Sequence, residues 1–406
     1  MLEIVIVQER GPDAVRAGEE HDSVELSVVM PCLNEDVTLP ACIRKAQQAI
    51  REHGLSAEIL IADNGSTDGS QQLATELGAR VVAVAERGYG AALAGGIAAA
   101  RGRFVIMADA DDSYDFSELY PFLEKLRAGD DLVMGCRLPS GGGRILPGAM
   151  PFKNRVFGNP VLSRIGRAVF RSNVTDFHCG MRGFRRQAIL DLDLRTTGME
   201  YASEMVIKAT LRGARISEIP ITLHKDGRDR RPHLRPWRDG WRHLRFMLLM
   251  SPRWLFLLPG LLLMLTGAAG IAWLLPGPRY VGRIGFDTTT LLVAAMVFLV
   301  GFQVVIYAVF ARMFAITEGL LQPDPVLTRA SRVISLEGGI VVGLVLFAGG
   351  FVLLAYAVWA WGQYGFGSVS ASFVQRLAIP ALTSMVLGIQ VVFSSFFVST
   401  LALARR

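Results

Sequence analysis

Residues 104–115 read FVIMADADDSYD, four apolar residues that lead directly into a cluster of carboxylates. The apolar run predicts a buried strand, so the carboxylates would lie together at its end. Like charges packed this closely repel one another, and burying them costs on the order of several kcal/mol unless a positive group pairs with them. The segment therefore predicts either a solvated acidic loop or a metal-ion site. The acidic residues are Asp109, Asp111, Asp112 and Asp115.

Strand-like and helix-like segments alternate before this acidic cluster. Strand–helix–strand repetition with short links predicts a parallel, doubly wound α/β sheet. Apolar runs predict strands at 26–31, 57–63, 79–84 and 103–109, and apolar residues at helical spacing predict helices at 39–53, 69–77 and 90–100.

Three polar clusters follow predicted strands of this sheet. Ligands of such sheets bind beyond the carboxyl ends of the strands, so we expect the clusters to form one site. In a D-x-D at a strand end, both carboxylates point to one side, which suits a hard cation. Mg²⁺ takes one or two protein carboxylates and completes its shell with waters and substrate phosphates. The clusters are Asn34 and Glu35, then Asp63, then Asp109, Ala110 and Asp111.

The C-terminal part of the chain is far more apolar than this sheet region. Of the 406 residues, 51% are hydrophobic, and four apolar stretches are long enough to cross a bilayer. We therefore expect a soluble α/β domain followed by an α-helical membrane domain with four transmembrane helices. The stretches are 254–275, 288–310, 340–361 and 377–402, and the expected parts are an N-terminal extension (1–23), the α/β domain (24–223), a basic juxtamembrane segment (224–252) and the membrane domain (253–406).

A strongly basic segment precedes the first apolar stretch. Residues 224–246 hold Lys225 and seven arginines beside Trp237 and Trp241, at spacings that predict an amphipathic helix. Such a helix would lie on the inner membrane surface, where anionic lipids attract cations. This predicts a multi-pass protein of the inner (plasma) membrane with its α/β domain and both termini in the cytoplasm. Further cations expected on that side are Arg312, Arg329, Arg332, Arg405 and Arg406.

Other features narrow the function classes. The N-terminus has no signal-peptide pattern. The net charge of +6 resides in local basic clusters without a nucleic-acid-binding motif, so we expect no nucleic-acid partner. The four cysteines lack metal-ligand spacing and are expected to be free thiols. The apolar stretches hold few charges, so they are expected to anchor the protein and to allow homo-oligomerisation.

Several motifs resemble a known family. VVMPCLNE, ADNGSTDGS, AERGYGAALAGGIAAARGRF and ADADDS resemble the nucleotide-sugar-binding half of family-2 glycosyltransferases of the GT-A fold. MGCR, VTDFHCGMRGFRRQAI and GMEYASEMVIKATLRGARISEIPI resemble the dolichyl-phosphate mannose/glucose synthase branch, which includes bacterial polyprenyl-phosphate glycosyltransferases. The similarity covers residues 26–221. It implies an inverting enzyme that transfers a hexose from UDP-glucose or GDP-mannose to undecaprenyl or dolichyl phosphate on the cytoplasmic face.

The resemblance also implies roles for the residues at the sheet edge. Glu35 and Asp63 would hold the nucleotide base and ribose, in a pocket shaped by Pro31 and Asn34. The D-x-D of Asp109, Ala110 and Asp111 would hold Mg²⁺ or Mn²⁺ against the diphosphate, with Asp111 as a direct ligand.

The acceptor side is implied in the same way. Arg137 would approach the acceptor phosphate, which arginine can grip with two parallel hydrogen bonds. Asp176 would orient the acceptor or the sugar, or act as a base if the acceptor were a hydroxyl. Asp176, Asp111 and Arg137 are thus the expected catalytic residues. The other residues expected near the acceptor phosphate are Lys153, Arg155, Arg182 and Glu204.

Two other functions remain open from the residues. A glycolipid synthase would use the same donor but a diacylglycerol or another lipid hydroxyl as acceptor. A catalytically silent membrane scaffold would bind the sugar nucleotide without turnover, although the intact D-x-D and Arg137 argue against this. A processive polysaccharide synthase is disfavoured, because RPWRDGW is not a QxxRW element.

Overall fold

The structure is a computed structural model and describes residues 24–228, 236–317, 336–363, 365–366 and 371–402. Several sequence expectations lie outside these ranges. They are the N-terminal extension 1–23, Arg230 and Arg231 of the basic segment, and Arg329, Arg332, Arg405 and Arg406.

The strand–helix units occur where the sequence predicts them, with ends that differ by at most two residues. Long apolar runs form the strands because helices cover the sheet on both faces. The units are β1 (Leu26–Cys32), α1 (Leu39–Glu52), β2 (Ala57–Asp63), α2 (Ser70–Glu76), β3 (Arg80–Ala83), α3 (Tyr89–Ala99) and β4 (Phe104–Met107).

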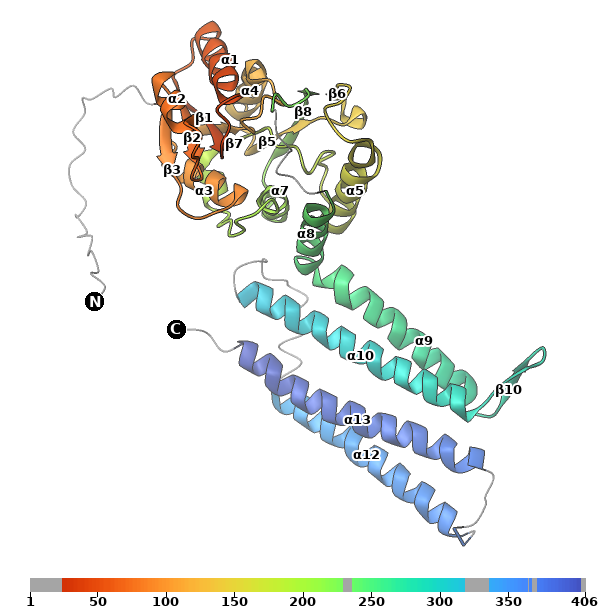
Figure 1. The fold of residues 1–406 in the computed structure, drawn as a ribbon. Helices are drawn as coiled ribbons and strands as arrows, with labels where there is room; N and C mark the ends of the chain where they lie inside the picture. Colours follow the sequence, from red (N-terminus) through yellow and green to blue (C-terminus); the bar gives the residue numbers. More distant parts are fainter. Residues whose placement is uncertain (1–23, 229–235, 318–335, 364, 367–370, 403–406) are drawn as a thin grey trace, which may run out of the picture.

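Seven strands form one sheet in the order β3-β2-β1-β4-β7-β5-β8 (Figure 1). Strand β7 runs antiparallel to β4 and β5, and every other pairing in this sheet is parallel. This confirms the expected doubly wound, mostly parallel α/β fold. The remaining elements are η1 (Phe116–Leu119), α4 (Tyr120–Arg127), β5 (Leu132–Cys136), η2 (Pro139–Gly141), β6 (Arg144–Ile145), η3 (Asn154–Gly158), α5 (Asn159–Phe170), β7 (Arg182–Arg185), α6 (Arg186–Leu190), α7 (Tyr201–Leu211), β8 (Ile216–Pro220), β9 (Thr222–Leu223) and α8 (Pro236–Leu249).

The register of β1 brings the polar loops to one edge. Leu26 lies opposite Ala57 on β2 and opposite Phe104 on β4, so the three strands begin level. Cys32 lies opposite Asp63 at the other end. The segments that follow these strands therefore leave the sheet side by side.

The small residues of α3 let this helix pack closely on the sheet. A Cβ atom at Gly96 would lie 2.7 Å from Val29 Cγ1 and 3.0 Å from Ala62 Cβ. A larger side chain would push the helix away from β1 and β2. The Ala- and Gly-rich composition of this segment thus reflects packing against the buried centre of the sheet.

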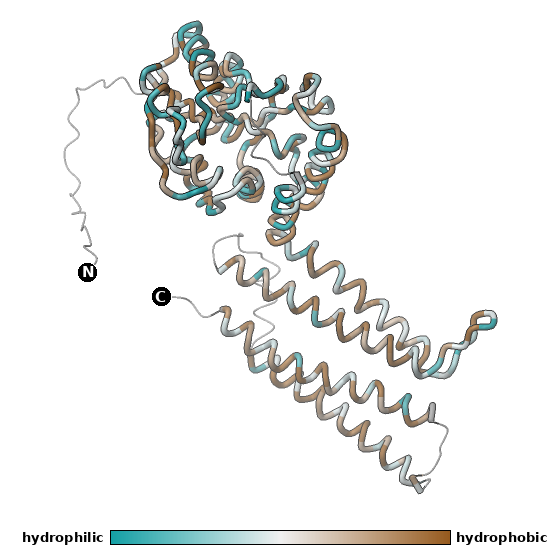
Figure 2. Tube along the Cα trace, in the orientation of Figure 1, coloured by the Kyte–Doolittle hydropathy of each residue, from teal (hydrophilic) through white to brown (hydrophobic). Residues whose placement is uncertain are grey.

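Four helices beyond the α/β part are long and apolar enough to cross a membrane. Figure 2 shows their hydrophobic character along their length. The number agrees with the sequence expectation, but a short hairpin of β10 (Arg279–Val281) and β11 (Ile284–Phe286) forms where only a loop was expected. The helices are α9 (Leu258–Leu274), which continues a short helical segment η4 (Arg253–Leu257), then α10 (Thr288–Thr317), α12 (Leu336–Gly362) and α13 (Ala371–Ala402).

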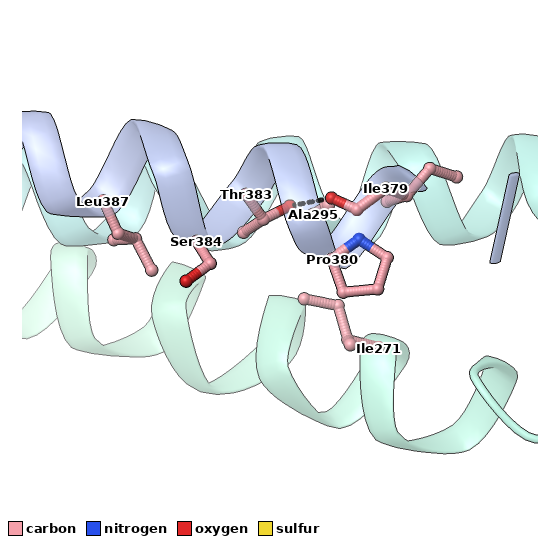
Figure 3. A pocket seen from close by; sticks show the side chains of 7 residues that line it. All are labelled: Ile271, Ala295, Ile379, Pro380, Thr383, Ser384 and Leu387. Carbon is pink, nitrogen blue, oxygen red and sulfur yellow. Dashed lines mark hydrogen bonds between the residues drawn. The ribbon is translucent and has the colours of Figure 1, made fainter. Parts of the chain in front are cut away.

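Small residues and polar side chains join these helices. A Cβ at Gly267 in α9 would lie 2.4 Å from the Phe298 nitrogen in α10, so the two backbones approach closely. Gln390 Nε2 donates to Gln303 Oε1 at 3.0 Å, which joins α13 to α10. An apolar cavity of about 160 Å³ lies beside Pro380, a proline inside α13 (Figure 3).

Candidate active site

The loops that follow β1 and β2 hold each other in place. Asn34 adopts a left-handed backbone conformation with a φ of 59°. Its side-chain oxygen accepts from the Thr67 nitrogen at 2.7 Å, and its own nitrogen donates to Ser66 Oγ at 2.9 Å. Pro31 lies just before this loop, in β1. Asn34 therefore joins the loop after β1 to the loop after β2 through hydrogen bonds.

Asp63 organises the loop of its own strand. Only 1% of its surface is exposed. Its carboxylate accepts from the backbone nitrogens of Gly65 and Ser66 and from Gln71 Nε2, at 2.6 to 3.4 Å. These contacts shape the loop expected to receive the nucleotide. A direct contact of Asp63 with the base or ribose stays a prediction.

The four carboxylates of the opening motif separate into two pairs. Asp112 forms an ion pair with Lys45 of α1 at 2.8 Å, and Asp115 accepts from the Ser117 nitrogen at the start of η1. Asp112 and Asp115 therefore have partners in neighbouring helices. Asp109 and Asp111 lie at the edge of the sheet, directly after β4.

Asp111 is buried and Asp109 is half-buried, and the buried Ala110 lies between them in the chain. Burial and the neighbouring charge of Asp111 raise the pKa of Asp109 to about 6. Asp109 Oδ1 has no hydrogen-bond partner within the described part of the chain. Asp111 Oδ1 accepts from the nitrogen and the hydroxyl of Ser113 at 3.0 and 2.6 Å. The pair thus concentrates negative charge that a nearby cation would stabilise.

Arg228 supplies a cation at this point. Its Nε and Nη2 donate to the Glu35 carboxylate at 2.7 to 3.1 Å, and its Nη1 lies 3.0 Å from Asp111 Oδ2. The Gly227 nitrogen donates to the Asp111 carbonyl at 3.0 Å, so the backbone is attached to the same loop. Arg228 thus joins the loop after β1 to the loop that carries Asp111.

The D-x-D residues fit a divalent cation that is shared with a substrate. Among the residues that the structure describes, no three His, Cys, Asp or Glu side chains converge on one point. The Asp111 carboxylate and the buried, unpartnered Oδ1 of Asp109 match the small protein share of a Mg²⁺ shell, in which substrate phosphates supply further oxygens. The Arg228 guanidinium shows that this position accepts positive charge.

Arg137 and Asp176 form a buried ion pair. Arg137 Nε and Nη2 donate to the two carboxylate oxygens of Asp176 at 2.7 and 2.9 Å, and Arg137 Nη1 donates to the Tyr114 hydroxyl at 3.2 Å. Burial alone would raise the pKa of Asp176, but the charge and hydrogen bonds of Arg137 outweigh it and lower that pKa. These contacts use three of the five guanidinium N–H groups of Arg137.

Arg182, which the sequence placed near the acceptor phosphate, is engaged within the fold, and its contact with that phosphate stays a prediction. It is fully buried, and its guanidinium donates to the carbonyls of Cys179, Phe177 and Ala202 at 2.6 to 3.2 Å. These bonds hold the loop that carries Asp176 against α7. The alignment with a family arginine could not reveal this orientation, because it depends on which side of β7 faces the helices.

Glu204 is likewise engaged within the fold. It pairs with Lys208 one helical turn away at 2.8 Å and accepts from the nitrogens of Arg195 and Thr196 at 2.9 to 3.1 Å. It therefore holds the loop before α7, whose Thr197 carbonyl accepts from the first residues of α3. A contact of Glu204 with the acceptor phosphate stays a prediction.

The remaining expected residues occupy different places. Lys153 and Arg155 are exposed near the start of the helical segment η3. His178 lies next to a polar chain: its Nε2 is 3.3 Å from Ser203 Oγ, which is 2.8 Å from His243 Nδ1 in α8. The sequence gave no signal for this chain, because its members are 25 and 40 residues apart.

Comparisons with known proteins agree with this arrangement. A model described as Glycosyl transferase family 2 matches residues 27–192, and one described as Glycosyltransferase family 2 C-terminal transmembrane region matches residues 309–402. The chain is 34% identical over 397 residues to the low-salt glycan biosynthesis hexosyltransferase Agl6 of Haloferax volcanii, covering 97% of this chain and 93% of that protein.

Two further similarities cover only the α/β part. A dolichyl-phosphate hexose transferase of Haloferax volcanii is 30% identical over 203 residues, which is 50% of this chain and 84% of that protein. Glucosyl-3-phosphoglycerate synthase from Mycobacterium tuberculosis is 21% identical with a TM-score of 0.44, over 55% of this chain and 78% of that one.

The mostly parallel sheet with its acidic edge and the four apolar helices define a membrane glycosyltransferase. The chain belongs to glycosyltransferase family 2. This confirms the family expected from the sequence motifs, with a GT-A-like fold and a relation to dolichyl-phosphate hexose transferases.

A substitution at Arg182 tests its structural role. Arg182→Met would leave three buried carbonyls without their donor, so the free energy of unfolding should fall by about 3 kcal/mol or more. Thermal unfolding in detergent would measure this. Arg185→Met is the matched control, because Arg185 makes an exposed ion pair with Asp131 that contributes little. A normally stable Arg182→Met with a raised KM for the acceptor would contradict the structural role.

The Arg137–Asp176 pair predicts a defined pH dependence of stability. Because the pKa of Asp176 is lowered in the folded protein, the pair stabilises above the ordinary aspartate pKa, and this contribution is lost as pH falls through the lowered value. Asp176→Asn should cost on the order of 3–5 kcal/mol near pH 7 by leaving Arg137 unpaired. Melting temperatures from pH 3 to 7 should show the wild-type advantage constant above about pH 4 and smaller below it. An advantage that grows on acidification would disprove the lowered pKa.

Proposed function

We propose that the protein transfers a hexose from UDP-glucose or GDP-mannose to undecaprenyl or dolichyl phosphate, with inversion at the sugar C1. The reaction would occur on the cytoplasmic face of the inner (plasma) membrane, in a catalytic domain spanning residues 24–223. The observation that carries this proposal is the buried Arg137–Asp176 ion pair. The similarity to a protein named dolichyl-phosphate hexose transferase supports it.

The ion pair favours an acceptor that needs no general base. An acceptor hydroxyl must lose a proton during transfer, and the candidate base would be Asp176. A carboxylate whose pKa is lowered by a bidentate arginine is a weak base. A phosphate monoester has a second pKa near 6 and is mostly dianionic at neutral pH, so it can attack without giving up a proton. This argues for the phosphate over the diacylglycerol acceptor.

Arg137 also suits an anionic acceptor. Two of its N–H groups are left after its bonds to Asp176 and Tyr114, and they are available to a phosphate oxygen. Asp176 would keep the guanidinium in one orientation. A phosphate held there would form its bond to the sugar C1 as the bond from C1 to the nucleoside diphosphate breaks.

On the donor side, Asp109 and Asp111 would hold Mg²⁺ or Mn²⁺. When bound, the ion would neutralise the charge that develops on the leaving diphosphate. Arg228 connects Glu35 to Asp111, and Glu35 would contact the nucleotide. The Arg228 guanidinium, which lies at these carboxylates, would pair with the diphosphate.

A transfer assay tests the reaction. Protein in detergent with Mg²⁺ or Mn²⁺ should move radiolabelled hexose from UDP-glucose or GDP-mannose to undecaprenyl phosphate, giving a product labile to mild acid. Asp111→Asn should lower the rate at least about 100-fold, because the diphosphate charge is no longer compensated. Asp112→Asn is the matched control and should retain activity, since Asp112 pairs with Lys45 outside the site.

The outcomes of this assay separate the candidates. Labelling of diacylglycerol but not of the phosphate would establish the lipid-hydroxyl acceptor instead. Nucleotide-sugar binding without any transfer would favour the silent scaffold.

Arg228 predicts a separate effect on nucleotide binding. Arg228→Gln should weaken binding of UDP or GDP, without metal, by about 10-fold or more, because one charge-assisted contact is lost. Isothermal titration calorimetry would measure it. Arg44→Gln on α1 removes an exposed arginine and serves as the control. Equal affinity of Arg228→Gln and the wild type would exclude a contact between Arg228 and the diphosphate.

A further inference from the structure

Tyr114 connects the two charged centres of the site. It lies three residues after Asp111, in the loop that follows β4, and only 3% of its surface is exposed. Its hydroxyl oxygen accepts from Arg137 Nη1 at 3.2 Å and from the Gly180 nitrogen at 2.8 Å. One side chain thus reaches from the loop of the D-x-D residues to the Arg137–Asp176 pair. It is not among the site residues expected from the sequence.

The backbone at Tyr114 is held by the segment that follows β8. Tyr114 pairs with Leu223 in an isolated antiparallel bridge. The His224 nitrogen donates to the Ser113 carbonyl at 2.9 Å. Ser113 in turn donates to the Asp111 carboxylate through its nitrogen and its hydroxyl. These bonds restrain the backbone, so the tyrosine ring has a defined reach toward Arg137.

Gly180 shows how closely the two centres approach each other at this tyrosine. A Cβ atom on Gly180 would lie 3.0 Å from the Tyr114 hydroxyl oxygen and 2.9 Å from Asp109 Oδ2. A side chain at this position would push the loop that carries Asp176 away from both groups. The glycine therefore allows the loop of the acceptor side to contact the loop of the donor side.

The bond from Arg137 to Tyr114 restrains a motion that Asp176 leaves open. Asp176 accepts from Nε and Nη2, which lie along one edge of the planar guanidinium. Two bonds along one edge still allow the plane to tilt about that edge. Tyr114 accepts from Nη1, the nitrogen that lies off this edge, so the third bond fixes the plane. The two remaining N–H groups of Arg137 then point in fixed directions.

We propose that Tyr114 is a positioning residue for the acceptor. Its hydroxyl fixes the Arg137 guanidinium relative to the D-x-D carboxylates, so a phosphate bound by Arg137 lies at a set place relative to the donor. Tyr114 acts through Arg137 and not by touching a substrate. This role rests on the proposed function, because it assumes that Arg137 receives the acceptor phosphate.

Kinetics in detergent test this role. Tyr114→Phe keeps the buried ring and removes only the hydroxyl, so KM for undecaprenyl phosphate should rise about 10-fold while KM for the nucleotide sugar stays unchanged. Tyr120→Phe is the matched control and should behave as the wild type, because Tyr120 stacks on His53 at the start of α4. Equal changes in both KM values of Tyr114→Phe would indicate a general structural defect and contradict the proposal.

A double-mutant cycle separates an action through Arg137 from an independent one. Arg137→Lys keeps a positive charge beside Asp176, but it replaces the planar fork by a single nitrogen. In this background Tyr114→Phe should cause no further rise in KM for the acceptor, because the guanidinium that it positions is already absent. A 10-fold rise in both backgrounds would overturn the proposal.

Thermal unfolding follows the same cycle without any transfer reaction. If Tyr114 holds Arg137, the losses in Tm of the two single variants should sum to more than the loss of the double variant. Additive losses would overturn the proposal, whether or not the protein transfers sugar. Non-additive losses together with transfer to a lipid hydroxyl would refute the proposed acceptor and support the action of Tyr114 on Arg137.

Discussion

The whole sheet edge depends on balancing the negative charge that the protein concentrates there. Glu35 and Asp111 are buried and Asp109 is half-buried beside them, and their mutual repulsion would separate them if no positive group were present. Arg228 provides that charge from a segment almost 200 residues after Glu35 in the chain. Through Arg228, the site therefore links the loop after the first strand of the sheet to the segment that leads to the membrane.

The second charged centre is balanced internally. Arg137 and Asp176 neutralise each other in a buried, bidentate contact, whereas the D-x-D residues rely on a cation from elsewhere. This difference separates the two halves of the proposed reaction. In that proposal the D-x-D centre would receive the donor with its cation, and the other centre would hold a rigid guanidinium for the acceptor.

Much of the fold could be predicted from the sequence, because strands, helices and membrane spans are indicated by short stretches of the chain. Apolar runs and glycine stops defined the strands and helices up to β4, and hydropathy defined the four long helices. The directions of buried side chains could not be predicted. Arg182 reads as a site arginine by its neighbours in the chain, but the packing of β7 between β4 and β5 directs it to backbone carbonyls. The His178–Ser203–His243 chain could not be predicted from the sequence either, because it forms only where α7 and α8 pack together.

The level start of β1, β2 and β4 also limits how such a chain can change over generations. Side chains of a strand alternate between two faces, so gaining or losing one residue within β4 would turn Asp109 and Asp111 to the opposite side. The loops beyond the strand ends face no such parity rule. A change of length in the connections would therefore leave the carboxylates on their face, whereas a change of one residue in β4 would not.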